Sequence, residues 1–264
     1  MGYVTLLSST MPVITDSSGM AVSAPGMSRG LVPRDYAKHP YGSSPVCGPA
    51  TINKIPRSEW DDRLELMDKN KSSLWDICDA RGIPVKYQNG ISFCWIHGGV
   101  HCVEVVLGSM GLPVVPLSAT SVGCKIKNFR NQGGWGQEGI EYVAEHGVVP
   151  QDLWPENKLE RSYDTPAAWE RAKDFKITEW DELENRDFDM LMSYLFHGIP
   201  VALGLDWWGH LITAMRPVAI SPGKYGVGID NSWGPSWGDN GRGVLVESKA
   251  RGDGTAPRVV VATA

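Results

Sequence analysis

The hydrophobic pattern of this chain changes character near residue 160, and no other sequence feature constrains its fold as strongly. From about residue 54 to 160 the signals are mainly helical: residues 94–109 form an apolar helix candidate, and residues 137–146 have apolar side chains on one face, with Gly147 as a stop. Ser118 is expected to cap a further short helix. From residue 161 onward, after a helix that ends at Gly198, short apolar runs alternate with Gly, Pro and Asp turns.

These later runs are the expected strands: residues 201–205, 211–215, 225–229, 244–246 and 259–261. The sequence therefore predicts an α+β protein, with a helical lobe over residues 54–160 and a largely antiparallel lobe over residues 161–264. A cleft between two lobes is where a substrate site tends to lie.

Residues 1–53 have neither a helical nor a strand period and are rich in Ser, Gly, Pro and Met. Such a segment cannot sustain a core of its own, so we expect an extended N-terminal arm. Two roles are open for this arm. It crosses the cleft and acts as a built-in inhibitor, or it reaches neighbouring subunits as an assembly device.

Composition excludes several classes of protein. The formal net charge is −5 and no run of Lys and Arg is present, which argues against a nucleic-acid partner. The longest apolar stretches, such as residues 100–107 and 199–205, are far shorter than the roughly 20 residues that cross a bilayer. We therefore expect no membrane-spanning segment. The first residues lack a basic leader with an apolar core, so a cytoplasmic location is the default expectation.

Cys94 has the sequence context of a reactive thiol. It follows the loop of residues 87–93 and begins the apolar helix candidate, where the helix dipole and free backbone N–H groups favour a thiolate. A thiol nucleophile also needs a base and a group that orients the base. His210 begins one expected strand and Asn231 follows another, so adjacent strands would place these two side chains together.

Four ordered motifs resemble those of the papain family of cysteine peptidases. Q-N-G-I-S-F-C-W, residues 88–95, resembles Q-G-x-C-G-S-C-W, and N-F-R-N-Q-G-G, residues 128–134, resembles the segment with the family's glycine pair. Gly209-His210 resembles the family's G-H-A, and residues 231–241 resemble N-S-W-G-x-x-W-G-x-x-G. The resemblance covers roughly residues 54–250.

The resemblance implies a role for each matched residue. Cys94 would be the nucleophile, His210 its proton partner, Asn231 the amide that orients the histidine, and Gln88 an oxyanion donor together with the Cys94 backbone N–H. The expected substrate-binding residues, which include the glycine pair and the tryptophan that shields the histidine, are Gly133, Gly134, Ser92, Trp208, Gly209 and Trp233.

Fold and activity follow as further expectations. The family has two lobes, the second of them β-barrel-like, and hydrolyses peptide bonds through an acyl-thioester, so this chain would hydrolyse peptide or isopeptide bonds of polypeptides without a cofactor. The alternative is a structural protein of a virion or another multi-subunit particle that retains the fold. Phe93, beside the nucleophile, and the short segment of eight residues between Val201 and His210 favour that alternative, because both alter the substrate groove.

The cysteines and histidines leave one further alternative. Ile91 and Asn131 stand where the family has a disulfide, and Cys124 has no cysteine after it, so we expect no disulfide and a reducing environment. His97 and His101 share a helical face with Cys94, and Cys102 is adjacent, which makes a metal cluster the alternative. A nucleophile bound to zinc could not act as proposed, so no metal is expected.

Overall fold

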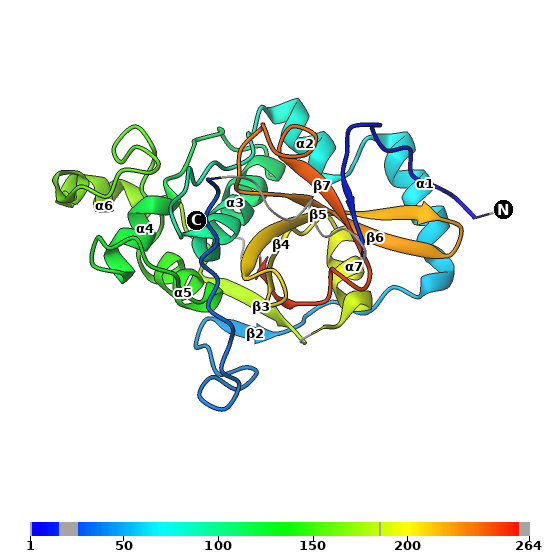
Figure 1. Ribbon diagram of the computed structural model, residues 1–264, viewed down its shortest axis with the longest axis horizontal. Helices are drawn as coiled ribbons and strands as arrows, with labels where there is room; N and C mark the ends of the chain where they lie inside the picture. Colours follow the sequence, from blue (N-terminus) through cyan, green and yellow to red (C-terminus); the bar gives the residue numbers. More distant parts are fainter. Residues whose placement is uncertain (1, 16–25, 185, 259–264) are drawn as a thin grey trace.

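A computed structural model describes residues 2–15, 26–184 and 186–258 (Figure 1). Its α-helices are α1 (Trp60–Asn70), α2 (Leu74–Arg81), α3 (Cys94–Ser109), α4 (Ala119–Ile126), α5 (Gly136–His146), α6 (Pro166–Ala172) and α7 (Phe188–Phe196). Two 3-10 turns, Arg57–Glu59 and Arg161–Tyr163, accompany them. The expected helix over residues 94–109 coincides with α3, and Ser118 caps α4 by accepting a hydrogen bond from the Ser121 N–H.

Helix α3 is buried along almost its whole length, because most of its residues are apolar and its polar residues His97, His101 and Glu104 are enclosed as well. It packs against β5 and β4 on one side and against α5, α2 and α4 on the other. Cys94, as the first residue of this helix, lies at the boundary between the helices and the sheet.

The strands form one mixed sheet of eight strands in the part of the chain that the structure describes. They are β1 (Val13–Ile14), β2 (Cys47–Pro49), β3 (Glu179–Leu183), β4 (Val201–Leu205), β5 (His210–Ser221), β6 (Lys224–Asp230), β7 (Arg242–Val246) and β8 (Asp253–Arg258), in the order β1-β7-β6-β5-β4-β8-β3-β2. The inner pairs are antiparallel, whereas β1 and β2 pair in parallel with β7 and β3.

Helices cover both faces of the sheet (Figure 1). Strand β4 shows how: Val201 and Leu203 pack in a core cluster with residues of α1 and α7, while Ala202 packs in a second cluster with residues of α3, α4 and α5. Alternate side chains of a strand point to opposite faces, so burial on both sides explains why β4 is a continuous apolar run.

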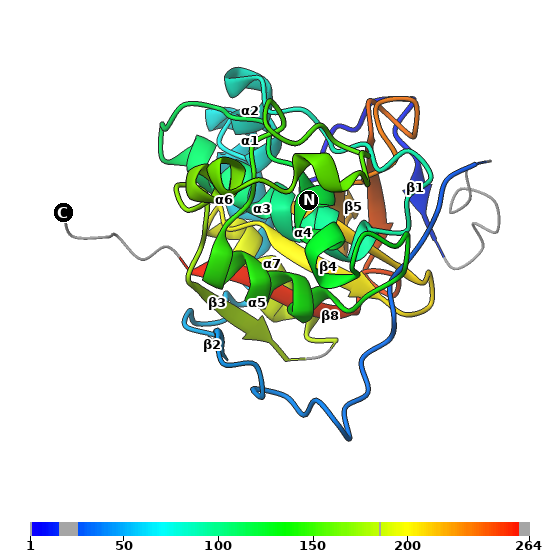
Figure 2. The ribbon, with the colours of Figure 1, turned by 90° about the vertical axis from the view of Figure 1, so that its left-hand side faces the viewer.

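The arm is part of this architecture. In its described parts, residues 2–15 and 26–53, the backbone is extended or in turns, and its regular elements are the two edge strands β1 and β2. Figure 2 follows the arm along the outside of the molecule to β2 below β3. Ile14 and Cys47 are buried in the core clusters, so the arm is anchored on both sides of the segment between them.

Several strand predictions were incomplete. The strand predicted over residues 211–215 was too short, since β5 continues to Ser221 with bulges in its pairing to β6. The sequence prediction missed β3 and β8, which are rich in charged residues and glycine. The strand expected over residues 259–261 lies outside the described residues. Among the helices that are described, none is both long and apolar enough to cross a membrane.

Candidate active site

Cys94 begins α3 directly after a tight loop. Asn89 and Gly90 adopt left-handed backbone conformations, with φ angles of 40° and 77°, and the Ile91 N–H donates to the Gln88 carbonyl at 2.8 Å. This turn reverses the chain and delivers it to the N-terminus of α3. The thiol therefore lies where the helix leaves backbone N–H groups unpaired.

The Gln88 side chain is buried and held in one orientation. Its Oε1 accepts from the Ser232 hydroxyl at 2.5 Å, so its Nε2 must point the other way, where it donates to the Ile91 carbonyl at 2.6 Å. The Gln88 backbone N–H also donates to the Ser232 carbonyl at 2.8 Å. Sequence reasoning missed Ser232, although it follows Asn231 directly in the motif.

His210 and Asn231 lie together because β5 begins with one and β6 ends just before the other. His210 Nε2 donates to Asn231 Oδ1 at 2.8 Å, and both side chains are buried. His210 Nδ1 has no hydrogen-bond partner among the residues that the structure describes. The ring of Trp233 lies 4.7 Å from the His210 ring, and the ring of Trp208 lies 5.1 Å away, so water is kept from the histidine–amide bond.

The arm crosses this site. The Gly30 N–H donates to Cys94 Sγ at 3.2 Å. Leu31 forms a parallel β-bridge with Gly134, in which the Val32 N–H donates to the Gly134 carbonyl and the Gly134 N–H donates to the Gly30 carbonyl, each at 2.9 Å. The Leu31 N–H donates to the Gly209 carbonyl at 3.2 Å. The arm therefore lies as an extended segment over the expected nucleophile.

The arm also uses the expected oxyanion donor. The Ser28 carbonyl accepts from Gln88 Nε2 at 2.8 Å and from Trp233 Nε1 at 3.1 Å. The group that contacts the Cys94 sulfur is the backbone N–H of Gly30. An N–H is not an electrophile, so the sulfur has no atom to attack at this contact. The contact is close, because a Cβ on Gly30 would lie 2.0 Å from the Ser92 carbonyl oxygen.

Burial under the arm opposes ionisation of both expected catalytic groups. It raises the pKa of the Cys94 thiol to about 11, although backbone N–H groups such as those of Leu211 and Gly30 favour the thiolate. It lowers the pKa of His210 to about 4, against the hydrogen bond to Asn231. With the arm in place, the pair is a neutral thiol and a neutral imidazole. The helix N-terminus is not sufficient to produce a thiolate here.

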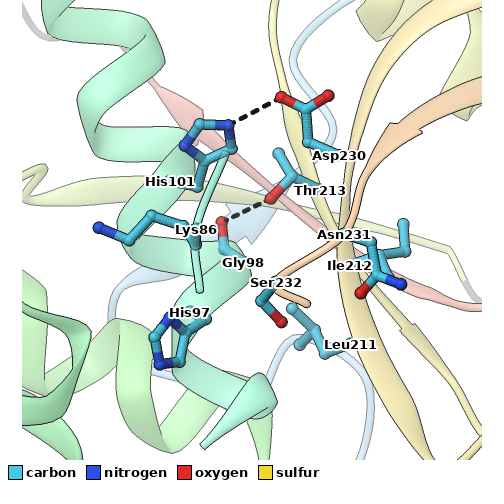
Figure 3. Close-up of a pocket in the computed structure, with 10 residues that line it drawn as sticks. All are labelled: Lys86, His97, Gly98, His101, Leu211, Ile212, Thr213, Asp230, Asn231 and Ser232. Carbon is cyan, nitrogen blue, oxygen red and sulfur yellow. Dashed lines mark hydrogen bonds and ion pairs between the residues drawn. The ribbon is translucent and has the colours of Figure 1, made fainter. Parts of the chain in front are cut away.

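A buried polar cluster lies behind the site, between α3 and the sheet (Figure 3). His101 Nε2 contacts Asp230 Oδ2 at 3.0 Å, and its Nδ1 contacts Glu104 Oε2 at 3.2 Å. Lys86 Nζ donates to Glu104 Oε1 at 2.9 Å. Asp230 precedes Asn231, so His101 ties the nucleophile helix to the strand that carries the amide. The metal alternative gains no support, since the described residues contain no His, Cys, Asp or Glu group arranged for an ion.

The predicted substrate-binding residues lie beside the arm. They include Gly133, where an added Cβ would lie 2.6 Å from the Gly30 carbonyl oxygen, and Ser92, whose carbonyl lies against Gly30. Gly134, Gly209 and Trp233 contact the arm through backbone or ring groups, as described above, and the Trp208 carbonyl accepts from the Arg29 guanidinium at 3.0 Å. Ser92 also donates its backbone N–H to Asn131 Oδ1 at 2.7 Å. That bond joins the two loops where the resemblance leads one to look for a disulfide. The five cysteines are free thiols.

The chain is similar to several plant cysteine proteases. It is 26% identical to chymopapain of Carica papaya over 194 residues, 65% of this chain and 54% of that protein. It is 23% identical to mexicain of Jacaratia mexicana over 194 residues, 65% of this chain and 86% of that protein. The chain thus spans about half the length of chymopapain. No protein-family model matches it.

Solved structures show the same fold. A structure from work on the mite allergens Blo t 1 and Der p 1 aligns with a TM-score of 0.65 at 13% identity, covering 93% of this chain and 84% of the other. Bromelain of Ananas comosus, in complex with the inhibitor E64, aligns with a TM-score of 0.54 at 20% identity, covering 71% and 98%. The predicted α+β fold, with a helical part and an antiparallel sheet, is confirmed.

Proposed function

The chain belongs to the papain-like cysteine protease family, and on this premise we propose that it is a cysteine peptidase that hydrolyses peptide or isopeptide bonds of polypeptides. One observation carries the proposal: His210 is oriented by Asn231 through Nε2, and its Nδ1 is unpaired among the described residues. Consecutive residues of the arm support its pairing with Cys94, since Gly30 binds the Cys94 sulfur and Leu31 binds Gly209, next to His210. A base held in this tautomer has one nitrogen free for a thiol proton.

The proposed reaction begins when the arm leaves the cleft. His210 Nδ1 takes the thiol proton, and Cys94 Sγ forms a bond to the carbonyl carbon of the substrate. Gln88 Nε2 and the Cys94 backbone N–H stabilise the oxyanion. The imidazolium then gives its proton to the leaving amine as the C–N bond breaks, which leaves an acyl-thioester. Water, deprotonated by His210, hydrolyses this thioester and restores the thiol.

The enzyme is latent in the conformation described, according to this proposal. The arm occupies the sulfur, the Gln88 amide and the Gly134 backbone at once, and these are the groups a substrate would use. Because the segment is tethered on both sides by β1 and β2, it is displaced as a loop rather than as a free tail. The assembly role of the arm stays a prediction.

Hydrolysis by a variant with a displaced arm tests the proposal. Gly30→Ala should cleave a denatured protein such as reduced casein faster than the natural chain, since a Cβ cannot fit against Ser92. The double variant with Cys94→Ala should be inactive while its melting curve stays cooperative. Equal cleavage with and without Cys94 would place the nucleophile elsewhere and overturn the proposal.

A further inference from the structure

A guanidinium lies buried beside the cleft. Arg34 follows the arm strand that crosses the active site, and only 2% of its side chain is exposed. Its Nη1 donates to Glu182 Oε1 and, at 3.3 Å, to Asp253 Oδ1. Glu182 is fully buried and 13% of the Asp253 side chain is exposed. Two carboxylates on neighbouring strands, β3 and β8, thus share one cation.

Neutral groups complete the enclosure. Arg34 Nε donates to the His39 carbonyl at 2.8 Å, and Nη2 donates to the Pro40 carbonyl at 2.8 Å. Three aromatic rings face the guanidinium carbon, at 4.9 Å, 5.4 Å and 5.9 Å from their centroids: Tyr36, Trp135 and Tyr41. We call the two carboxylates, the two carbonyls and the three rings around the guanidinium the cage. The planar donors and delocalised charge of an arginine suit this cage, and a lysine ammonium would match it less well.

The cage does not depend on Arg34 for its own integrity. Glu182 Oε2 accepts from the Gly42 N–H at 2.5 Å, and the Tyr41 hydroxyl donates to the Glu182 carbonyl. Gln137 Nε2 donates to Asp253 Oδ2 at 3.0 Å. The residues that follow Arg34 are anchored by β2. If residues 28–34 leave the cleft, Glu182, Asp253 and Trp135 remain, because they lie outside the arm on β3, on β8 and directly before α5.

An empty cage would hold two buried carboxylates without a cation. Burial already raises the pKa of Asp253, and Arg34 opposes that shift. The cage also borders a small pocket that Asp253, Trp135 and Gln137 line together with Leu31 of the arm and Leu211. Leu31 pairs with Gly134, and Leu211 follows His210. An extended peptide over Cys94 would therefore pass the cage.

We propose that Glu182, Asp253 and Trp135 form a guanidinium-binding subsite, which the arm fills with Arg34 and which takes an arginine side chain of the substrate once the arm is displaced. The substrate part of this proposal rests on the proposed peptidase function. Arg34 lies four positions after Gly30, which contacts the sulfur, so the subsite selects an arginine within about four residues of the bond that is cleaved.

Binding of free arginine to the full chain with an emptied cage tests the subsite without any activity. Arg34→Ala is titrated with N-acetylarginine amide, and N-acetylcitrulline amide is the uncharged control of the same shape. The arginine compound should raise the melting temperature of the variant in a saturable way, by about 3–5 °C at ten times its Kd. The natural chain should show no shift, because Arg34 fills its cage.

Two further variants keep the test decisive. Arg34→Gln removes the charge but keeps an amide NH2 that can donate to one of the carbonyls, and it serves if Arg34→Ala does not fold. Adding Asp253→Asn to either variant should weaken arginine binding at least tenfold. Equal shifts with arginine and citrulline compounds, or no shift in either Arg34 variant, would overturn the subsite and leave Arg34 as an anchor of the arm only.

A cleavage profile separates this proposal from the peptidase itself. Gly30→Ala acting on a mixed peptide library should enrich arginine near the cleaved bonds, and Asp253→Asn should abolish that enrichment. Hydrolysis without arginine preference and without a melting shift would overturn the subsite while the peptidase stands. A melting shift without hydrolysis by any variant would support the subsite and count against the peptidase.

Discussion

At the residue scale, Gly30 determines whether the arm can lie against Cys94. A Cβ at this position would lie 2.0 Å from a backbone oxygen of Ser92, which cannot move aside as a side-chain end could. Overpacking of this kind typically costs ~1–3 kcal/mol. We expect Gly30→Ala to alkylate at Cys94 about 10- to 100-fold faster than the natural chain, as measured with iodoacetamide and mass spectrometry at one pH.

A matched control is Gly2→Ala, whose Cβ would meet its nearest atom at 3.1 Å, next to Asp61 and Pro222 rather than at the cleft. This variant should label Cys94 at the natural rate. If both variants label alike, the arm does not restrict access to the thiol.

Closure of the arm should depend on pH in a direction set by the two buried groups. With the arm in place the pKa of His210 is lowered to about 4 and that of Cys94 raised to about 11, by burial in both cases. Solvent in an open cleft returns them toward about 6.5 and 8.5. Protons therefore bind the open form more tightly between about pH 6.5 and 4, and closure weakens as pH falls through that window. It weakens likewise as pH rises from about 8.5 to 11.

The ratio of Cys94 labelling rates, Gly30→Ala over the natural chain, isolates this effect because the intrinsic chemistry of the thiol cancels. With 4,4′-dithiodipyridine, which reacts with thiols in acid, the ratio should be largest near pH 7.5 and fall toward one near pH 4.5. A ratio that stays constant over this range would contradict the linkage to His210.

Motif order assigned Gln88, Cys94, His210 and Asn231 to one site, because each stands at the boundary of an element that the hydrophobic pattern predicts. All four residues are buried, and their joint action stays a prediction. The contact of Ser232 with Gln88 was not predictable, since it joins residues far apart in the chain by side-chain orientation. The raised pKa of Cys94 was also missed. The raised pKa depends on the arm, and the path of the arm could not be predicted because its sequence has no helical or strand period.

At the element scale, a buried ion pair joins α3 to β6. His101 on α3 contacts Asp230 on β6, and we call this contact the tie. The His101 pKa is raised: burial alone would lower it, but hydrogen bonds to Asp230 and Glu104 prevail. The charged imidazolium thus links two carboxylates across the boundary between the helices and the sheet. The stabilisation by this imidazolium is complete below about pH 6.5, the pKa of a histidine in the unfolded chain. It is lost as the pH rises through the raised pKa of His101 in the folded protein.

Removing one partner of this buried tie should be costly. Asp230→Asn should lower the free energy of unfolding by about 3–5 kcal/mol, as measured by urea denaturation near pH 6, because it leaves a buried charge without its partner. Asp79→Asn is the control. Both Asp230 and Asp79 contact Arg242, but 64% of the Asp79 side chain is exposed, so its loss should cost less than about 1 kcal/mol. Equal losses of unfolding free energy in the two variants would show that the contact between His101 and Asp230 does not stabilise the fold.

Elements with strong apolar patterns were predictable and charged elements were not. Residues 94–109 and 201–205 match α3 and β4 because hydrophobic burial selects their sequences. Strand β3 reads as a polar segment, since its buried carboxylates Asp181 and Glu182 are neutralised by Arg258 and Arg34 from distant parts of the chain. Partners so remote in sequence cannot be inferred from a local pattern.

At the scale of the whole molecule, the arm is built into the sheet on both sides of the segment that crosses the cleft. Ile14, on β1, is fully buried in the core cluster with α1 and α7. Ile14→Ala should therefore destabilise the protein by about 2–4 kcal/mol and lower its melting temperature. Leu6→Ala, in the same arm with 95% of its side chain exposed, should shift stability by less than about 0.5 kcal/mol. If the two substitutions had equal effects, β1 would not be an anchor.

The central claim is that Cys94 and His210 act as one nucleophilic site beneath the arm. The most direct measurement is to treat Gly30→Ala with an epoxysuccinyl peptide and map the modified cysteine by mass spectrometry. We expect Cys94 to be labelled and the buried Cys47, Cys78, Cys102 and Cys124 to remain unlabelled. We also expect that adding His210→Ala slows this labelling at least ~100-fold. Labelling spread over several cysteines, or labelling of Cys94 that is unchanged without His210, would contradict the central claim.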